Sequence, residues 1–166
     1  TSHSSMFTGL LPYNHGVRFL LDKRKAVLAD GHVTLAEIFR NNGANTAAFI
    51  SAVPASSDFG LHQGFEVFDE TFERDGRINQ RRGDKTADAG VAWLEDVEEP
   101  FLGWMHFFDP HDPKIVPPRP TLDQFKPTDL TNKDVLVRAI YDAEVHFMDQ
   151  QIQRLLEVLE QRQLED

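Results

Sequence analysis

A histidine flanked by prolines is the first candidate for chemistry in this chain. Residues 109–113 read Asp-Pro-His-Asp-Pro and directly follow an apolar run that ends at Phe108. The two prolines restrict the backbone on each side of His111, and an imidazole held in one direction can donate a hydrogen bond to an anion. We therefore predict that His111 is a catalytic and substrate-binding residue and that Asp109 helps to bind the substrate. The competing interpretation is that both side chains only close a proline-rich loop.

Small hydroxyl residues at the start of the chain form a second candidate site. Residues 1–9 read Thr-Ser-His-Ser-Ser-Met-Phe-Thr-Gly, and we expect a short helix among them. The N-terminus of a helix attracts anions, so Ser2 is a candidate substrate-binding residue, although serines here can also serve only as N-caps. Ser2 and His3 do not make an activated nucleophile by themselves, because the side chains of neighbouring residues diverge.

Alternating helix and strand patterns supply the scaffold that these candidates need. The expected elements are a helix over residues 5–10, a loop over 13–16, a helix from 34 to 43, a strand over 46–50, a helix over 84–97, a strand over 101–108, an irregular loop over 109–130 and a helix over 133–163. Thr34 and Glu37 have the spacing of a capping box, and Asp84 can cap the helix that it begins. His106, inside an apolar run, is expected to be a core histidine with its hydrogen bonds satisfied. The order predicts an α/β fold with a mostly parallel sheet flanked by helices, whose strand ends usually bind ligands.

The composition excludes several classes of function. The 166 residues carry 17 Lys and Arg against 27 Asp and Glu, a formal net charge of −10, so the chain lacks the basic face that nucleic acid requires. The longest basic runs are residues 23–25 and 81–82. The absence of cysteine excludes disulfides, thiolate metal sites and a cysteine nucleophile within these residues. No apolar stretch approaches the roughly 20 residues needed to cross a bilayer, so no membrane span is expected.

Taken in order, the segments resemble the sulfatase family of the alkaline-phosphatase-like superfamily over essentially all 166 residues. The segments that carry the resemblance are residues 1–9 and 11–17 (the sulfatase signature through His-Gly-Val), 34–49 (the next helix and strand), 60–66 (Gly-Leu-His-Gln-Gly-Phe-Glu), 107–113 (the Asp-Pro-His-x-Pro loop) and 141–149 (the long helix after it). The chain starts without methionine and stops after a helical pattern, so we expect a segment, one partial catalytic domain over 1–166.

The resemblance also implies a chemistry. In that family a formylglycine made from Cys or Ser attacks sulfur, calcium held by carboxylates neutralises the sulfate oxygens, and basic side chains surround the anion. His111 matches the family histidine that contacts sulfate. His3 is implied to be catalytic at a position where arginine is usual, and Thr1 stands where proline is usual. Histidine donates to an anion only in a suitable protonation state, so we expect a more pH-sensitive affinity than with arginine.

Other parts of the family pattern are expected outside this chain. The nucleophile would lie two positions before Thr1 and the calcium ligands before or after these residues, so no metal ligand is predicted within them. Residues 51–54 (Ser-Ala-Val-Pro) also lack the family's Lys-x-His.

Three functions remain open at this point. The leading one is a calcium-dependent sulfatase that hydrolyses a small-molecule or glycan sulfate ester, with the segment alone inactive. The second is a phosphodiesterase or phosphotransferase of the same superfamily, with a Ser or Thr nucleophile and zinc. The third is an inactive fragment or anion-binding module. The family resemblance implies a periplasmic or secreted location.

Overall fold

The computed structural model describes residues 1–18, 26–72, 79–111 and 115–164. Asp112 and Pro113 of the proline-flanked loop, and the basic run at 23–25, lie outside the described residues. In chain order the elements are α1 (Ser2–Thr8), α2 (Pro12–His15), α3 (Leu35–Asn41), β1 (Asn45–Ile50), the 3₁₀ turns η1 (Val53–Ala55) and η2 (Ser57–Phe59), β2 (Val67–Asp69), α4 (Gly83–Asp96), β3 (Phe101–His106), the 3₁₀ turn η3 (Asp109–His111), α5 (Arg119–Gln124) and α6 (Lys133–Gln161).

The three strands form one parallel sheet in the order β2-β1-β3. In the register of the central pair, Asn45 is opposite Phe101 and Ile50 is opposite His106. Their carboxyl ends therefore meet at one edge of the sheet, and η3 begins after two intervening residues beyond the end of β3. The predicted α/β fold with a parallel sheet flanked by helices is confirmed.

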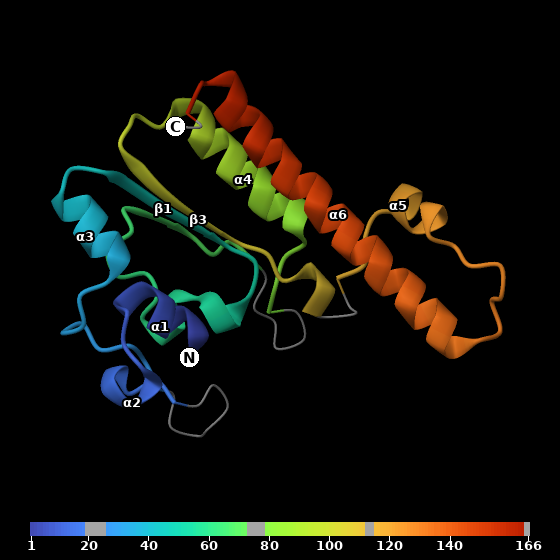
Figure 1. Ribbon diagram of the computed structural model, residues 1–166, viewed down its shortest axis with the longest axis horizontal. Coiled ribbons are helices and arrows are strands. Elements are labelled where there is room, and N and C mark those ends of the chain that lie inside the picture. The colour runs from blue at the N-terminus through green and yellow to red at the C-terminus, as the bar shows by residue number, and fades with distance from the viewer. Residues whose placement is uncertain (19–25, 73–78, 112–114, 165–166) are drawn as a thin grey trace.

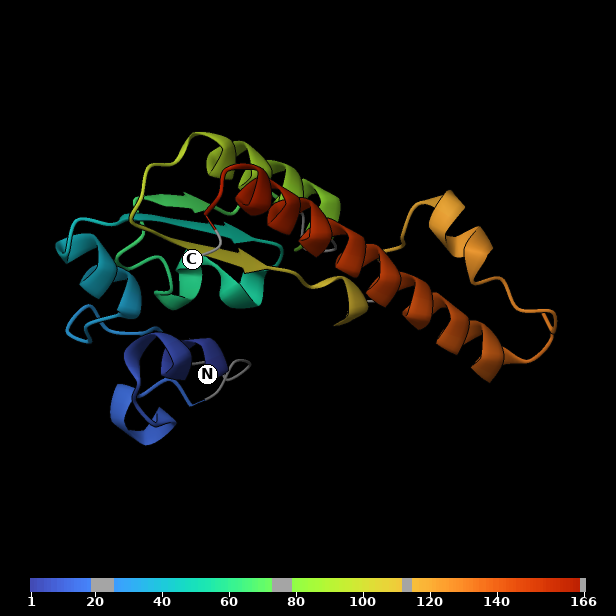
Figure 2. The same cartoon turned by 45° about the horizontal axis from the view of Figure 1, so that its top comes forward.

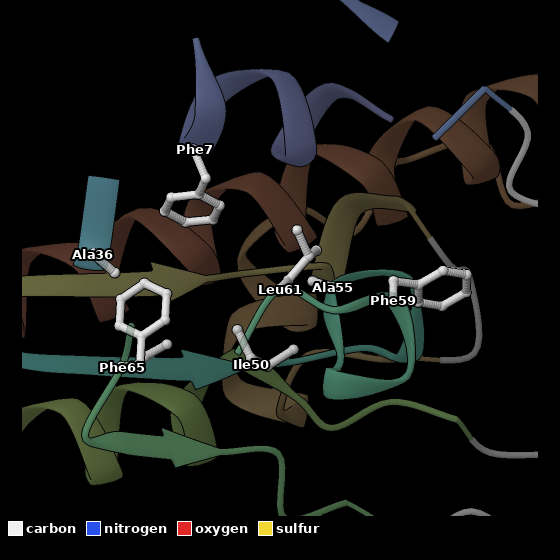
Figure 3. Packing of buried hydrophobic residues seen from close by; sticks show 8 residues of the cluster. Phe7, Ala36, Ile50, Ala55, Phe59, Leu61 and Phe65 are labelled. Carbon is white, nitrogen blue, oxygen red and sulfur yellow. The ribbon is translucent and has the colours of Figure 1, made fainter. Parts of the chain in front are cut away.

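Helices cover both faces of the sheet, as Figure 2 shows with α4 and α6 on one side and α1 and α3 on the other. Alternate residues of β3 face the two layers: Leu102 and Trp104 pack with the α1 and α3 side, and Phe101 and Met105 with α4 and α6. Phe7 points from α1 toward the strands in the first of these cores (Figure 3). α5 packs against α6, and both extend beyond the sheet (Figure 1).

The two predicted helix caps have different outcomes. The capping box of α3 is confirmed, since Thr34 Oγ1 accepts from the Glu37 amide at 3.2 Å and Glu37 Oε2 accepts from the Thr34 amide at 2.7 Å. The predicted cap at Asp84 is wrong. Asp84 lies in the first turn of α4, and its Oδ2 pairs with Arg82 Nη2 at 2.6 Å. The carboxylate that accepts from a first-turn amide of α4 is that of Asp109, which follows β3 and binds the Gly83 amide. A tertiary partner has replaced the local one.

Some element boundaries differ from the expectations. α1 begins at Ser2 rather than residue 5, and α2 and α5 occupy segments that were expected to be irregular. Both unexpected helices carry proline in the first turn, where its missing N–H costs nothing. β2 was not predicted because three residues are too few to give a pattern, and it forms by pairing with β1. Among the described residues, no helix is both long and apolar enough to span a membrane.

Candidate functional site

A row of rings joins the two predicted catalytic histidines at the carboxyl edge of the sheet. His106 ends β3, and its ring centre lies 5.1 Å from that of His3 on α1, with the planes at 81°. On its other side, His106 stacks on Phe108 at 6.0 Å, and Phe108 contacts His111 at 4.5 Å. The structure therefore brings His3 and His111, 108 positions apart (111 − 3), to the same edge through two intervening rings.

His111 is the most accessible member of this row. It ends η3, its backbone amide donates to the Phe108 carbonyl at 3.0 Å, and its side chain is exposed. The contact with the Phe108 ring limits the directions that the imidazole can take. An exposed imidazole in a turn at a strand end can bind an anion, so the geometry is compatible with the predicted role.

His3 is half-buried between two aromatic side chains. Its ring centre lies 5.3 Å from that of Trp104 and 5.1 Å from that of His106. Burial lowers the pKa of His3. The ring is therefore neutral at pH 7 and can donate through one nitrogen only.

Asp109 is buried next to the first turn of α4, which its carboxylate contacts. The residue is 1% exposed, and Oδ1 accepts from the Gly83 amide at 2.8 Å. Oδ2 is buried and has no hydrogen-bond partner in the part of the chain that the structure describes. Burial raises the pKa of Asp109. Its observed contact is with the helix, and its substrate-binding role stays a prediction.

Ser2 is the exposed first residue of α1. The N-cap residue of α1 is Thr1, and within the described chain no side-chain hydrogen bond caps the helix. Simple capping by a serine is therefore not what the structure shows. The substrate-binding role of Ser2 stays a prediction.

The sequence pattern missed a Ser-His pair between α1 and α2. Ser5 Oγ lies 2.9 Å from His15 Nε2, and His15 Nδ1 accepts from the Val17 amide at 3.1 Å. Because Nδ1 is an acceptor, the proton of the neutral ring is on Nε2, which donates to the serine. Burial lowers the pKa of His15, which favours this neutral form. A ring in this tautomer cannot take the serine's proton, so the pair joins two helices and is not a nucleophile and its base.

A second polar network fixes the carboxyl end of β1. Ser51 Oγ lies 2.6 Å from Thr86 Oγ1, which also accepts from Arg81 Nε at 3.0 Å. Arg81 Nη1 binds Asp69 at the end of β2 at 2.9 Å. Although burial alone would raise it, hydrogen bonds from Thr71 and Arg81 lower the pKa of Asp69. These side chains are hydrogen-bonding partners of one another, so they hold the carboxyl end of β1 in place. No local pattern reveals contacts between residues this far apart.

Ligands for a metal are the next requirement of the predicted chemistry. Among residues 1–18, 26–72, 79–111 and 115–164, no group of three or more His, Cys, Asp or Glu side chains could hold an ion. These residues therefore do not fit calcium, and we derive no step through it.

Comparison with known proteins identifies the family. A family model described as Sulfatase matches residues 1–166. Curated protein sequences gave no match. Similar solved structures include one described with glycosaminoglycan metabolism by Bacteroides thetaiotaomicron (TM-score 0.73, 18% identity, 98% of this chain and 46% of that chain). The phosphonate monoester hydrolase of Agrobacterium radiobacter (TM-score 0.71, 16% identity, 96% and 49%) and a 2-O GAG sulfatase (TM-score 0.60, 20% identity, 95% and 43%) are also similar.

These structures share the fold, and the chain spans less than half the length of each one. The family match covers every residue and includes the signature segment with His3 and the loop with His111. The chain belongs to the sulfatase family.

Proposed function

We propose that this chain is the central part of a hydrolase that cleaves sulfate esters. The observation that carries the proposal is the row of rings from His3 through His106 and Phe108 to His111. It puts two imidazoles at the carboxyl edge of a parallel sheet, where α/β proteins bind their ligands.

The two histidines have different tasks in this proposal. Cleavage of a sulfate ester needs a nucleophile, compensation of charge on the sulfate oxygens and a proton for the leaving oxygen. His111, which is exposed, hydrogen-bonds a sulfate oxygen. His3, which is half-buried and neutral, donates a single hydrogen bond to the same group. Ser2 and Asp109 remain predicted substrate-binding residues.

The nucleophile and metal of the proposal come from the family. A sulfatase generally uses a formylglycine as nucleophile and a metal that neutralises sulfate charge, and we propose that the metal is calcium. No described group of residues fits that metal, so the residues named above act only in binding and orienting the ester.

A glycan sulfate ester is the substrate class that we propose. Two of the similar structures are described in connection with glycosaminoglycans, one of them as a 2-O GAG sulfatase. An exposed edge residue such as His111 suits a sulfate group presented on a larger molecule.

A phosphoryl hydrolase is the second candidate, and the likeness to a phosphonate monoester hydrolase favours it. Charge separates the two candidates. A sulfate monoester carries one negative charge and a phosphate monoester close to two at neutral pH. A neutral His3 in a chain with a net charge of −10 compensates little negative charge, which supports sulfate.

Turnover distinguishes these candidates. The protein in its natural full-length form is incubated with calcium and with 4-nitrophenyl sulfate, then with 4-nitrophenyl phosphate, and with zinc in place of calcium. Faster turnover of the sulfate ester with calcium is expected. Faster turnover of the phosphate ester would replace the first candidate by the second, and no turnover of either would leave an anion-binding module.

A further inference from the structure

Packing alone does not explain why a histidine occupies position 106. The residue is 9% exposed, and its Nδ1 has no hydrogen-bond partner among the residues that the structure describes. A buried polar atom without a partner costs free energy. A phenylalanine, like the two that follow it in the sequence, would fill the same aromatic surroundings without that cost. His106 therefore needs a reason other than the core.

The imidazole of His3 is the ring closest to His106, and it has a nitrogen that can form a hydrogen bond with Nδ1. The contacts with Trp104 and Phe108 are at 5.8 and 6.0 Å, whereas the imidazole of His3 lies at 5.1 Å. A ring nitrogen lies roughly 1.1 Å from its ring centre, and a hydrogen bond between two nitrogens spans roughly 2.9 Å. The separation of 5.1 Å is therefore the one at which two imidazoles share a hydrogen bond once a ring rotates to align the nitrogens.

We propose that His106 is a positioning residue for His3: its Nδ1–H donates a hydrogen bond to one ring nitrogen of His3 and so directs the N–H of the other nitrogen of His3 toward the anionic substrate. The inference rests on the proposed function and adds a residue to the same site. A catalytic imidazole is commonly oriented through its second nitrogen in this way. Burial, followed by the charge of His3, lowers the pKa of His106 to about 4, so at neutral pH its ring is neutral and has one N–H to donate.

A metal site is the other use that two neighbouring imidazoles could have. Catalytic zinc sites have three protein ligands. In the described ranges, His3 and His106 have no third His, Cys, Asp or Glu that would complete such a group. The hydrogen bond accounts for the unpartnered nitrogen without a further ligand.

Nitrogen NMR of the histidine rings tests the proposal directly. The protein in its natural full-length form is labelled with ¹⁵N-histidine, and two-bond proton–nitrogen correlations report which nitrogen of each ring carries a proton, with and without inorganic sulfate. We expect one fixed tautomer for His3 and the shift of a protonated, hydrogen-bonded Nδ1 for His106. His106→Phe should average the His3 tautomers and weaken sulfate binding by about fivefold, the worth of one hydrogen bond.

Two variants make the test specific. His106→Asn puts a side-chain amide near the place of Nδ1, where its N–H can donate to His3, and should preserve the His3 tautomer. His146→Phe makes the same change on α6, where the ring contacts Phe125, and should change neither His3 nor sulfate binding. If His106→Phe does not fold, the wild-type Nδ1 shift and the asparagine variant decide the question.

The outcomes separate this inference from the proposed function. An unprotonated Nδ1 in the wild type, or a His3 ring and a sulfate affinity that do not respond to His106→Phe, would overturn the positioning role. A His3 tautomer that depends on His106 in a full-length protein without sulfatase turnover would support the hydrogen bond and remove the proposed function.

Discussion

Asp109 Oδ1 accepts a hydrogen bond from the backbone amide of Gly83 at 2.8 Å, and this bond joins the end of β3 to the start of α4. The loop that carries His111 leaves the sheet at this carboxylate. The position of the exposed histidine therefore depends on a buried contact two residues before it.

Gly83→Ala tests how closely the helix and the carboxylate approach. A Cβ at Gly83 would lie 2.8 Å from Asp109 Oδ2 and 3.1 Å from the Phe107 ring. We expect a loss of about 1–3 kcal/mol in the free energy of unfolding, the usual cost of overpacking, measured by urea denaturation. Gly31→Ala is the matched control, since its Cβ would meet no atom of the described residues within 4 Å. Equal effects of the two substitutions would contradict the close contact.

Asp109→Asn tests the buried charge. Burial raises the pKa of Asp109 above 3.8, so the folded state holds this proton more tightly than the unfolded state does. The stability contributed by this group is therefore greatest below pH 3.8 and is lost as the pH rises through the folded-state pKa. Asparagine still accepts from Gly83 but does not titrate. Relative to it, the wild type should lose stability as the pH rises from 3.8. A constant difference between the two unfolding free energies would refute this.

Local and non-local signals explain which features the sequence could predict. The capping box of Thr34 and Glu37 and the apolar run of β1 depend on neighbouring residues, and both were predicted from spacing. His3 and His111 were chosen from motifs, but the row of rings that joins them depends on α1 packing over β3, which no spacing encodes. The Asp109 contact likewise needs α4 to start beside the end of β3.

His106 should make stability depend on pH in the opposite direction from Asp109. Its pKa is lowered from 6.5 to about 4 in the folded state, so the unfolded chain takes up the proton first as the pH falls. The free energy of unfolding should therefore decrease between pH 6.5 and 4, by on the order of 3 kcal/mol from this residue. Urea denaturation across this range should show the decrease, and His106→Phe should reduce it. The same slope in both proteins would mean that other groups cause it.

Ser5 offers a direct check on the pair with His15. The tautomer fixed by the Val17 amide makes the serine an acceptor, so Ser5→Ala should cost about 1 kcal/mol of stability and leave sulfate-ester turnover close to the parent value. Loss of a true nucleophile would lower turnover by more than about a thousandfold. Thermal unfolding and steady-state kinetics on one preparation distinguish these results, and a thousandfold loss with the fold intact would make Ser5 catalytic.

His111→Ala is the most direct test of the site. The side chain is exposed and contacts the Phe108 ring, so its removal should change the free energy of unfolding by less than about 0.5 kcal/mol. Turnover of a sulfate ester by the full-length protein should fall at least about tenfold, since a hydrogen bond to the reacting group is lost. His146→Ala removes an imidazole from α6, where the ring contacts Phe125, and serves as the control. If kcat and KM of His111→Ala match those of the control, His111 does not touch the substrate, and His3 would be the remaining histidine that binds it.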